Sequence, residues 1–290
     1  MLKRAVLAMS LATFLTGCAN SGIDALNTME PGWSVRVTRD IAYGPGPRQA
    51  LDVYSPRRVK PGAPVVVFFY GGGWDSGDKG MYPFVGKALA SHGYVAVIPD
   101  YRVYPAGRYP DFLIDAAKAV SWTRTHAAEY GADTSRLFLM GHSAGAYNAV
   151  MLALDRRWLA ADGPDPGAIK GVVGLAGPYD FLPLTSSRLK EIFGPEDQRP
   201  ATQPINHVEP GAPPMLLFHD LGDTVVYPKN TENLAAKLKA NGDAVETRYY
   251  KGLNHALLVG ALATPLRFVA PVFRDATEFI DREAAKPQAK

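Results

Sequence analysis

Runs of continuous apolar residues alternate along the chain with stretches that are apolar at helical spacing. Continuous Val, Ile, Leu and Phe runs are typical of strands covered on both faces. Strand-like runs, several of them continuous in this way, predict strands at Ser34–Tyr43, Gln49–Tyr54, Val65–Tyr70, Tyr94–Pro99, Arg136–Met140, Lys170–Ala176, Pro214–His219 and Val245–Lys251. Apolar residues at helical spacing predict helices at Met81–His92, Asp111–Tyr130, Ala144–Leu154, Lys229–Ala240 and Pro271–Glu283.

The alternation of strand and helix predicts an α/β fold with a mostly parallel, eight-stranded sheet flanked by helices. The first two strands are joined by a short connection, so we expect them to be antiparallel. Residues 177–214 depart from the alternation because they are rich in proline and lack periodicity. We interpret them as an insertion or a small cap. Ligands in such sheets bind outside the carboxyl ends of the strands, which directs attention to the residues that follow each strand.

A serine lies in a tight turn after the predicted strand Arg136–Met140. The sequence Gly141-His142-Ser143-Ala144-Gly145 fits the pattern G-x-S-x-G between a strand and a helix. In that context a sharp turn exposes the serine hydroxyl above the sheet, and the N-terminus of the following helix faces the site. Ser143 is therefore the candidate nucleophile.

A serine hydroxyl needs a base at neutral pH, and the base needs a group that orients it. In this architecture the order along the chain is Ser, then Asp or Glu, then His. Asp223 lies in the loop after the strand Pro214–His219, and Asp220 is an alternative closer to that strand. His255 lies in the loop after the last predicted strand. We predict that Ser143, Asp223 and His255 form a catalytic triad, with Asp223 preferred to Asp220.

The other histidines are less suited to act as the base. His142 lies within the serine turn, and we expect its side chain to point elsewhere. His219 ends a strand and is expected to be packed in a structural role. His92, His126 and His207 fall on predicted helices or in the insertion.

Several motifs together indicate a family. The segments "YGGGWDSGDK", "PDYRVYPAGRYPDFLIDAAKAVSW", "GHSAG", "FHDLGDTVV" and "GLNHA" occur in this order between about Trp33 and Glu283. The chain is similar to the α/β-hydrolases, and within that fold it resembles the bacterial carboxylesterase and hormone-sensitive-lipase-like group. We therefore expect one hydrolase domain over residues 33–284 and a short tail at 285–290.

The resemblance implies a role for the glycines after the strand Val65–Tyr70. The backbone N–H groups of Gly72, Gly73 and Ala144 are expected to form an oxyanion hole, where bare backbone can approach the reacting oxygen. Alternatively, the glycines after this strand simply form a flexible loop without a catalytic role. Tyr70 stands where histidine is commonest in the family, and that residue is thought to brace the loop.

The expected reaction is hydrolysis of short-chain or acetyl carboxylic esters through an acyl-enzyme intermediate, without cofactor or metal. An arylformamidase-like amide hydrolase and a non-catalytic binding protein on the same fold are the alternatives. The sequence does not give the acyl-chain length or the oligomeric state. The aromatic residues that could line a pocket are Trp74, Tyr101, Tyr104, Tyr179 and Phe181.

The N-terminus has the pattern of a targeting segment. A positive start, "MLKR", precedes the apolar run "AVLAMSLATFL", which is too short to span a bilayer comfortably. The following Leu15-Thr16-Gly17-Cys18 resembles the lipobox of bacterial lipoproteins. That resemblance implies a signal peptide at 1–17, lipidation of Cys18 and a membrane anchor, with residues 18–32 as a tether. Ala19 favours the outer membrane facing the periplasm if the cell has two membranes. A secreted protein with a chance cysteine is the alternative.

Composition narrows the possible partners. The chain has 290 residues, of which 47% are hydrophobic and 20% charged, as in ordinary globular proteins. The formal net charge is +3, and the basic residues are dispersed instead of forming a block typical of nucleic-acid binding. Cys18 is the single cysteine, so no disulfide within the chain is possible. We expect a small-molecule ester as the partner and no nucleic acid.

Overall fold

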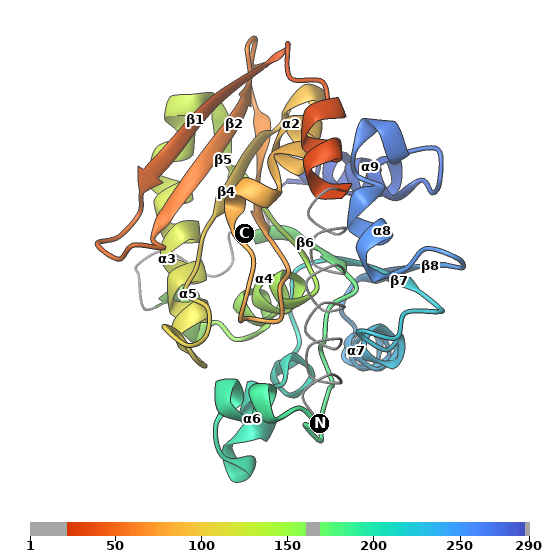
Figure 1. Cartoon of the computed structure of the whole chain (residues 1–290). Helices are drawn as coiled ribbons and strands as arrows, with labels where there is room; N and C mark the ends of the chain where they lie inside the picture. Colours follow the sequence, from red (N-terminus) through yellow and green to blue (C-terminus); the bar gives the residue numbers. More distant parts are fainter. Residues whose placement is uncertain (1–21, 161–168, 288–290) are drawn as a thin grey trace, which may run out of the picture.

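A single eight-stranded sheet forms the centre of the molecule (Figure 1). The computed structural model describes residues 22–160 and 169–287. The strands follow the order β1-β2-β4-β3-β5-β6-β7-β8; β1 and β2 are antiparallel to their neighbours, and β3 to β8 are parallel. The predicted fold class and the antiparallel start are confirmed. The strands are β1 Val35–Ala42, β2 Ala50–Pro56, β3 Ala63–Phe69, β4 Val95–Pro99, β5 Ala132–His142, β6 Ile169–Leu175, β7 Met215–Asp220 and β8 Val245–Tyr250.

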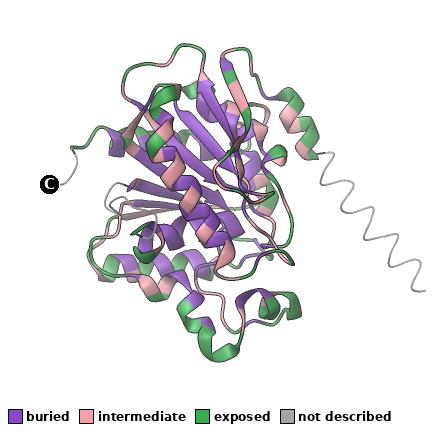
Figure 2. Ribbon diagram, turned by 90° about the vertical axis from the view of Figure 1, so that its left-hand side faces the viewer, coloured by how far each residue is buried: buried purple, intermediate pink, exposed green. Residues whose placement is uncertain are grey.

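Helices cover both faces of the sheet, and their outer sides are exposed (Figure 2). The chain moves in one direction from β3 to β4 and in the other from β4 through β8. Right-handed crossovers therefore place α2 on one face and α3, α4 and α7 on the other. The helices are α2 Pro83–His92, α3 Asp111–His126, α4 Ala144–Leu154, α5 Arg157–Ala160, α6 Ser187–Phe193, α7 Lys229–Ala240, α8 His255–Gly260 and α9 Val272–Ala284. Short 3-10 helices are η1 Lys79–Met81, η2 Ala127–Tyr130, η4 Glu196–Thr202, η5 Pro204–His207 and η6 Thr264–Leu266.

The parallel strands bring the loops of interest to one edge. β3 pairs with β5, with Phe69 opposite Gly141, so the glycine loop after β3 begins beside the serine turn after β5. β7 pairs with β8, with Asp220 opposite Tyr250, so the loops that carry Asp223 and His255 leave the sheet together. The topology thus gathers the candidate residues at the carboxyl edge.

The predicted tether at residues 18–32 is wrong for its described part. Residues 22–29 are helical, and Asn27 bonds the carbonyl of Met81 and the backbone N–H of Phe84 at the start of α2. Glu30 is buried and its carboxylate accepts bonds from the backbone and hydroxyl of Thr264. These polar anchors make the segment a part of the domain. Cys18 and the predicted signal peptide at 1–17 lie outside the described residues, within which no helix is long and apolar enough to cross a membrane.

The predicted insertion, residues 177–214, carries α6 and two 3-10 helices in place of regular layers. It is attached by buried contacts. Phe193 of α6 is buried against Trp74, with a ring distance of 4.8 Å, and the Tyr147 hydroxyl of α4 donates to the carbonyl of Thr202 at 2.7 Å. The segment therefore forms a packed wall beside the carboxyl edge of the sheet.

Candidate active site

Ser143 occupies the turn between β5 and α4. Its backbone has φ 54° and ψ −123°, a conformation that side-chain-bearing residues rarely adopt and that is found at strained functional turns. The flanking glycines are sterically required: a Cβ at Gly145 would lie 2.0 Å from the carbonyl oxygen of Phe69, and one at Gly141 would lie 2.2 Å from that of Gly145. Within the described part of the chain, the Ser143 hydroxyl has no hydrogen-bond partner. It is free to meet a substrate.

The imidazole of His255 is held by the carboxylate of Asp223, with 2.6 Å between Nδ1 and Oδ2. The Asp223 side chain is fully buried, and its Oδ1 accepts backbone N–H bonds from Val225 at 2.8 Å and Val226 at 3.1 Å. Since the carboxylate accepts at both oxygens, Nδ1 of His255 carries the proton. Nε2 is left to accept the proton of a serine hydroxyl.

The two candidate aspartates have different tasks. Asp220, at the end of β7, accepts bonds from the backbone N–H groups of Gly222 and Leu253, both at 2.9 Å. It thereby ties the loop before His255 to the strand, but its carboxylate does not bond the imidazole. Asn254 caps α8 by accepting from the backbone N–H of Leu257 at 2.8 Å, so His255 is the first residue of a short helix. The carboxylate that bonds the imidazole is that of Asp223.

His142 does not point away from the site, contrary to our expectation. Its Nε2 donates to the backbone carbonyl of His255 at 2.9 Å, and the two rings lie 4.7 Å apart. The serine turn and the histidine loop are therefore in direct contact. Among the residues that the structure describes, Nδ1 of His142 finds no hydrogen-bond partner, although it is buried. Burial, reinforced by the nearby His255, lowers the pKa of His142 to about 3, so the ring is neutral.

His219 is structural, as its position suggested. It is buried, its Nε2 donates to the carbonyl of Val226 at 2.8 Å, and its Nδ1 lies 2.8 Å from the hydroxyl of Thr231. Its Nε2 is also 3.6 Å from Oδ2 of Asp223, so it supports the turn that presents the carboxylate. Burial lowers the pKa of His219 as well.

These lowered pKa values predict an acid-sensitive fold. Between pH 6.5 and 5 the unfolded chain protonates His142 and the folded chain does not, so the free energy of unfolding falls as the pH falls. His142 contributes a slope that approaches about 1.4 kcal/mol per pH unit, and the lowered pKa of His219 acts in the same direction. His142→Leu should reduce the wild-type slope by about one such contribution. Urea unfolding at pH 7, 6 and 5 measures it, and an unchanged slope in the variant would contradict the burial of a neutral His142.

Three backbone N–H groups predicted for an oxyanion hole are unpaired among the described residues. In the described structure, those of Gly72, Gly73 and Ala144 make no hydrogen bond. Gly72 has φ 132° and Gly73 has φ 59°, and a Cβ at Gly72 would lie 2.2 Å from the carbonyl oxygen of Ser76. Ala144 is the first residue of α4. Unpaired donors beside the nucleophile are suited to stabilise developing negative charge.

Most of the aromatic residues proposed for a pocket are core residues. Tyr101 and Tyr179 are fully buried, and Trp74 is 3% exposed. Trp74 packs edge-on against Tyr147 at 5.0 Å and lies above Phe181 at 6.1 Å. Aromatic rings therefore fill the space that extends from the glycine loop toward the insertion.

The arrangement brings together a candidate nucleophile, a candidate base with a carboxylate hydrogen-bonded to it, and backbone donors left unpaired in the described structure. Among the residues that the structure describes, no three His, Cys, Asp or Glu side chains gather in a way that could hold a metal. The site therefore has the components of acyl transfer by a serine.

Comparisons with known proteins agree with the fold and with ester chemistry. The BD-FAE family model matches residues 51–238. A probable isoprenylcysteine alpha-carbonyl methylesterase, ICMEL1 of Arabidopsis thaliana, is 31% identical over 81% of this chain and 54% of its own length. Esterase LipC of Mycobacterium tuberculosis is 30% identical over 70% of this chain and 55% of its own. The chain thus spans little more than half the length of these curated relatives.

One solved esterase structure is similar to this chain over almost the whole of both proteins. Thermogutta terrifontis esterase 2 is 26% identical, with a TM-score of 0.71, and the match covers 87% of this chain and 96% of that one. The same esterase has been solved phosphonylated by sarin.

Proposed function

This chain belongs to the BD-FAE family and has the α/β-hydrolase fold, and on that premise we propose that it is a serine carboxylesterase for short-chain or acetyl esters. The observation that carries the proposal is the 2.6 Å bond between Asp223 and His255 in contact with the strained turn of Ser143. The esterases among its relatives support the same reaction.

The geometry supports a two-step reaction. Ser143 Oγ attacks the acyl carbon while His255 Nε2 takes its proton, and the N–H groups of the oxyanion hole stabilise the tetrahedral intermediate. His255 then protonates the leaving alcohol, which yields the acyl-enzyme. Water, deprotonated by His255, releases the acid and restores the serine. Asp223 keeps the imidazole oriented and stabilises its charged form.

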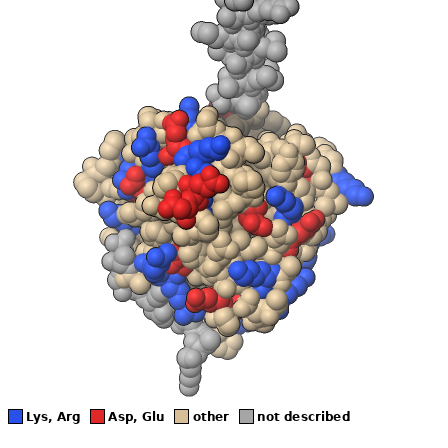
Figure 3. Space-filling model, turned by 90° about the horizontal axis from the view of Figure 1, so that it is seen from below, with Lys and Arg blue, Asp and Glu red and all other residues tan. Residues whose placement is uncertain are grey.

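The packed aromatic residues beside the site are the reason for proposing a substrate with a short acyl group. Trp74 directly follows the oxyanion glycines, Tyr147 lies one helical turn after Ser143, and both are buried. A long acyl chain on this side would have to displace well-packed rings. The face seen from below, on which α6 lies, shows charges of both signs interspersed among uncharged residues, in keeping with an uncharged substrate (Figures 1 and 3).

A p-nitrophenyl ester series measured beside N-formylkynurenine tests this proposal. We expect the highest kcat/KM for acetate or butyrate and a decrease of about tenfold or more at octanoate, because added methylenes meet the aromatic wall. Equal or higher kcat/KM for octanoate would contradict the short acyl site. Faster turnover of N-formylkynurenine than of any ester would favour the arylformamidase alternative.

We also propose that the chain is anchored to the cell envelope through lipidated Cys18, on the basis of the N-terminal sequence alone. Metabolic labelling with a fatty-acid analogue should mark the wild type and not Cys18→Ser. Absence of label on the wild type would refute the anchor.

A further inference from the structure

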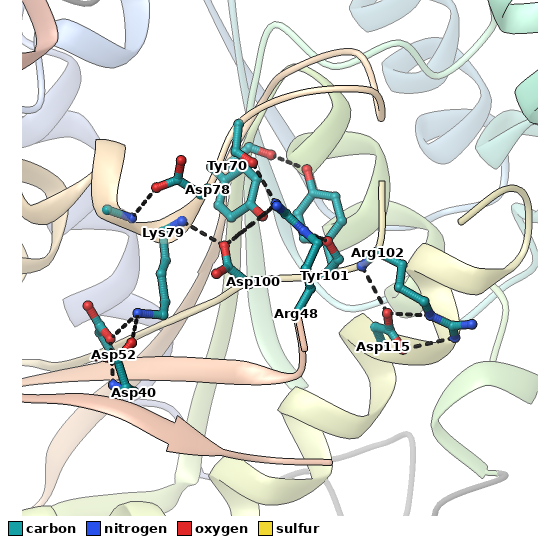
Figure 4. Close-up of polar contacts among 12 residues, drawn as sticks. Asp40, Arg48, Asp52, Tyr70, Asp78, Lys79, Asp100, Tyr101, Arg102 and Asp115 are labelled. Atoms are coloured by element: carbon teal, nitrogen blue, oxygen red, sulfur yellow. Dashed lines mark hydrogen bonds and ion pairs between the residues drawn. The ribbon is translucent and has the colours of Figure 1, made fainter. Parts of the chain in front are cut away.

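The hydroxyl of Tyr70 lies between two charged residues at the start of the oxyanion loop, residues 70–79. It accepts a bond from Nη2 of Arg48 at 2.8 Å and donates to Oδ1 of Asp100 at 2.9 Å (Figure 4). The ring is stacked on Tyr101 at 4.6 Å and on Tyr82 at 5.8 Å. Tyr70 is fully buried, and burial raises the pKa of its hydroxyl, so the proton stays available for Asp100.

The same two charged residues also hold the far end of the oxyanion loop. Nη2 of Arg48 donates to the carbonyl of Gly77 at 2.6 Å, and Oδ1 of Asp100 accepts from the backbone N–H of Lys79 at 2.7 Å. Arg48 and Asp100 lie 3.8 Å apart as an ion pair. Both ends of the loop are thus fixed to one pair of side chains, which come from outside the loop.

Further bonds anchor this pair to the sheet. Nε of Arg48 donates to the carbonyl of Tyr101 at 2.8 Å, and the Tyr101 hydroxyl donates to the carbonyl of Tyr70 at 2.7 Å. Asp100 directly follows β4, the strand beside β3. We call Arg48, Tyr70 and Asp100 the loop clamp.

The loop needs such restraint because glycine backbone is flexible and Trp74 is strained. Gly72 and Gly73 adopt φ of 132° and 59°, which glycine reaches without cost but does not keep by itself. Trp74 has φ 60°, a conformation that a residue with a side chain keeps only where the surrounding structure holds it. Oxyanion donors must also stay within a fraction of an ångström of their working position, because a misplacement of about 1 Å can cost about 10²-fold in rate.

We propose that Arg48 and Asp100 are positioning residues for catalysis, which act through Tyr70 and both ends of the loop to hold the N–H groups of Gly72 and Gly73 in place. The inference rests on the proposed esterase function. It also accounts for a tyrosine at position 70, since one phenol can accept from Arg48 and donate to Asp100 at the same time. The clamp stabilises the oxyanion and leaves the resting substrate almost unaffected.

Tyr70→Phe with Tyr94→Phe as a matched control tests this role. Tyr94 is also buried, and its hydroxyl donates to Asp281 at 2.8 Å, but it lies just before the amino end of β4, away from the site. We expect Tyr70→Phe to lower kcat by about 10- to 100-fold with KM changed less than about twofold, because a transition-state contact is lost. Tyr94→Phe should lose similar stability in urea and keep wild-type kcat.

A double-mutant cycle adds a second readout. Arg48→Met and Tyr70→Phe remove the same restraint, so the double variant should be about as slow as the slower single variant. If Tyr70→Phe is not recovered folded, Arg48→Met is measured against Tyr94→Phe with the same expectation. Wild-type kcat in the clamp variant, an equal loss in Tyr94→Phe, or fully multiplicative losses in the cycle would overturn the clamp.

Failure of the clamp and failure of the proposed function are distinguishable. If the wild type hydrolyses p-nitrophenyl esters and reacts with a fluorophosphonate, the function stands whatever the clamp variants do. If the wild type does neither, the function itself is refuted, and with it the basis of the clamp.

Discussion

Ser143→Ala is expected to lower kcat on p-nitrophenyl acetate by about 10⁴-fold or more. The substitution removes the oxygen that would attack the acyl carbon and form the acyl-enzyme, so the Asp223–His255 pair has no hydroxyl to activate at position 143. The residual rate would come from the oxyanion donors and from His255 acting on water.

The fold should tolerate this change. The Ser143 hydroxyl makes no hydrogen bond within the described residues, so its removal leaves no polar group unpaired. Unchanged circular dichroism and an unchanged thermal midpoint provide the control. A folded Ser143→Ala that retained wild-type kcat would show that another group is the nucleophile.

Asp223→Asn should lower kcat by about 10⁴-fold, and Asp220→Asn by less than tenfold. An asparagine at 223 can satisfy the N–H groups of Val225 and Val226 with its oxygen and then turns its amide NH₂ toward His255. That favours the tautomer with the proton on Nε2, which cannot accept a proton from Ser143.

Asp220→Asn is the matched control because the carboxylate contacts backbone groups and not the imidazole. An asparagine at 220 can accept from only one of Gly222 and Leu253 and sets its NH₂ against the other N–H, at a cost of about 1–3 kcal/mol in stability. Steady-state kinetics of both variants decide between the aspartates. A larger loss in Asp220→Asn would reverse the assignment of the two roles.

The sheet could be predicted from the sequence because its signals are local. Each of the eight predicted strands is present with shifts of at most a few residues. The continuous apolar runs, such as β3 and β4, are buried strands covered on both faces, whereas β1 and β8 are partly exposed. The positions of Ser143, Asp223 and His255 followed from chain order, since parallel strands bring their carboxyl ends to one edge.

The hydrogen bonds that hold the site loops in place join residues far apart in the sequence, and they were not predicted. His142 reaches the carbonyl of His255 across 113 residues, and Arg48 reaches Tyr70 from a connection before β2. Neither pairing has a periodic signature. Because His142 directly precedes Ser143, we expected its side chain to point away from the site. The sharp turn instead directs the imidazole of His142 toward the loop that carries His255.

The N-terminal helix was misjudged for another reason. Residues 22–29 form a short segment that mixes apolar and polar side chains, so it resembled a linker. Their place in the domain depends on single buried polar contacts, such as that of Glu30 with Thr264. Such contacts carry no pattern that a single sequence could display.

The most direct test of the account is stoichiometric labelling with a fluorophosphonate probe, followed by mass mapping of the modified residue. The account predicts one probe per chain on Ser143 and no modification of the folded Ser143→Ala variant. A wild type that stays unlabelled, or a label on any other residue, would contradict it.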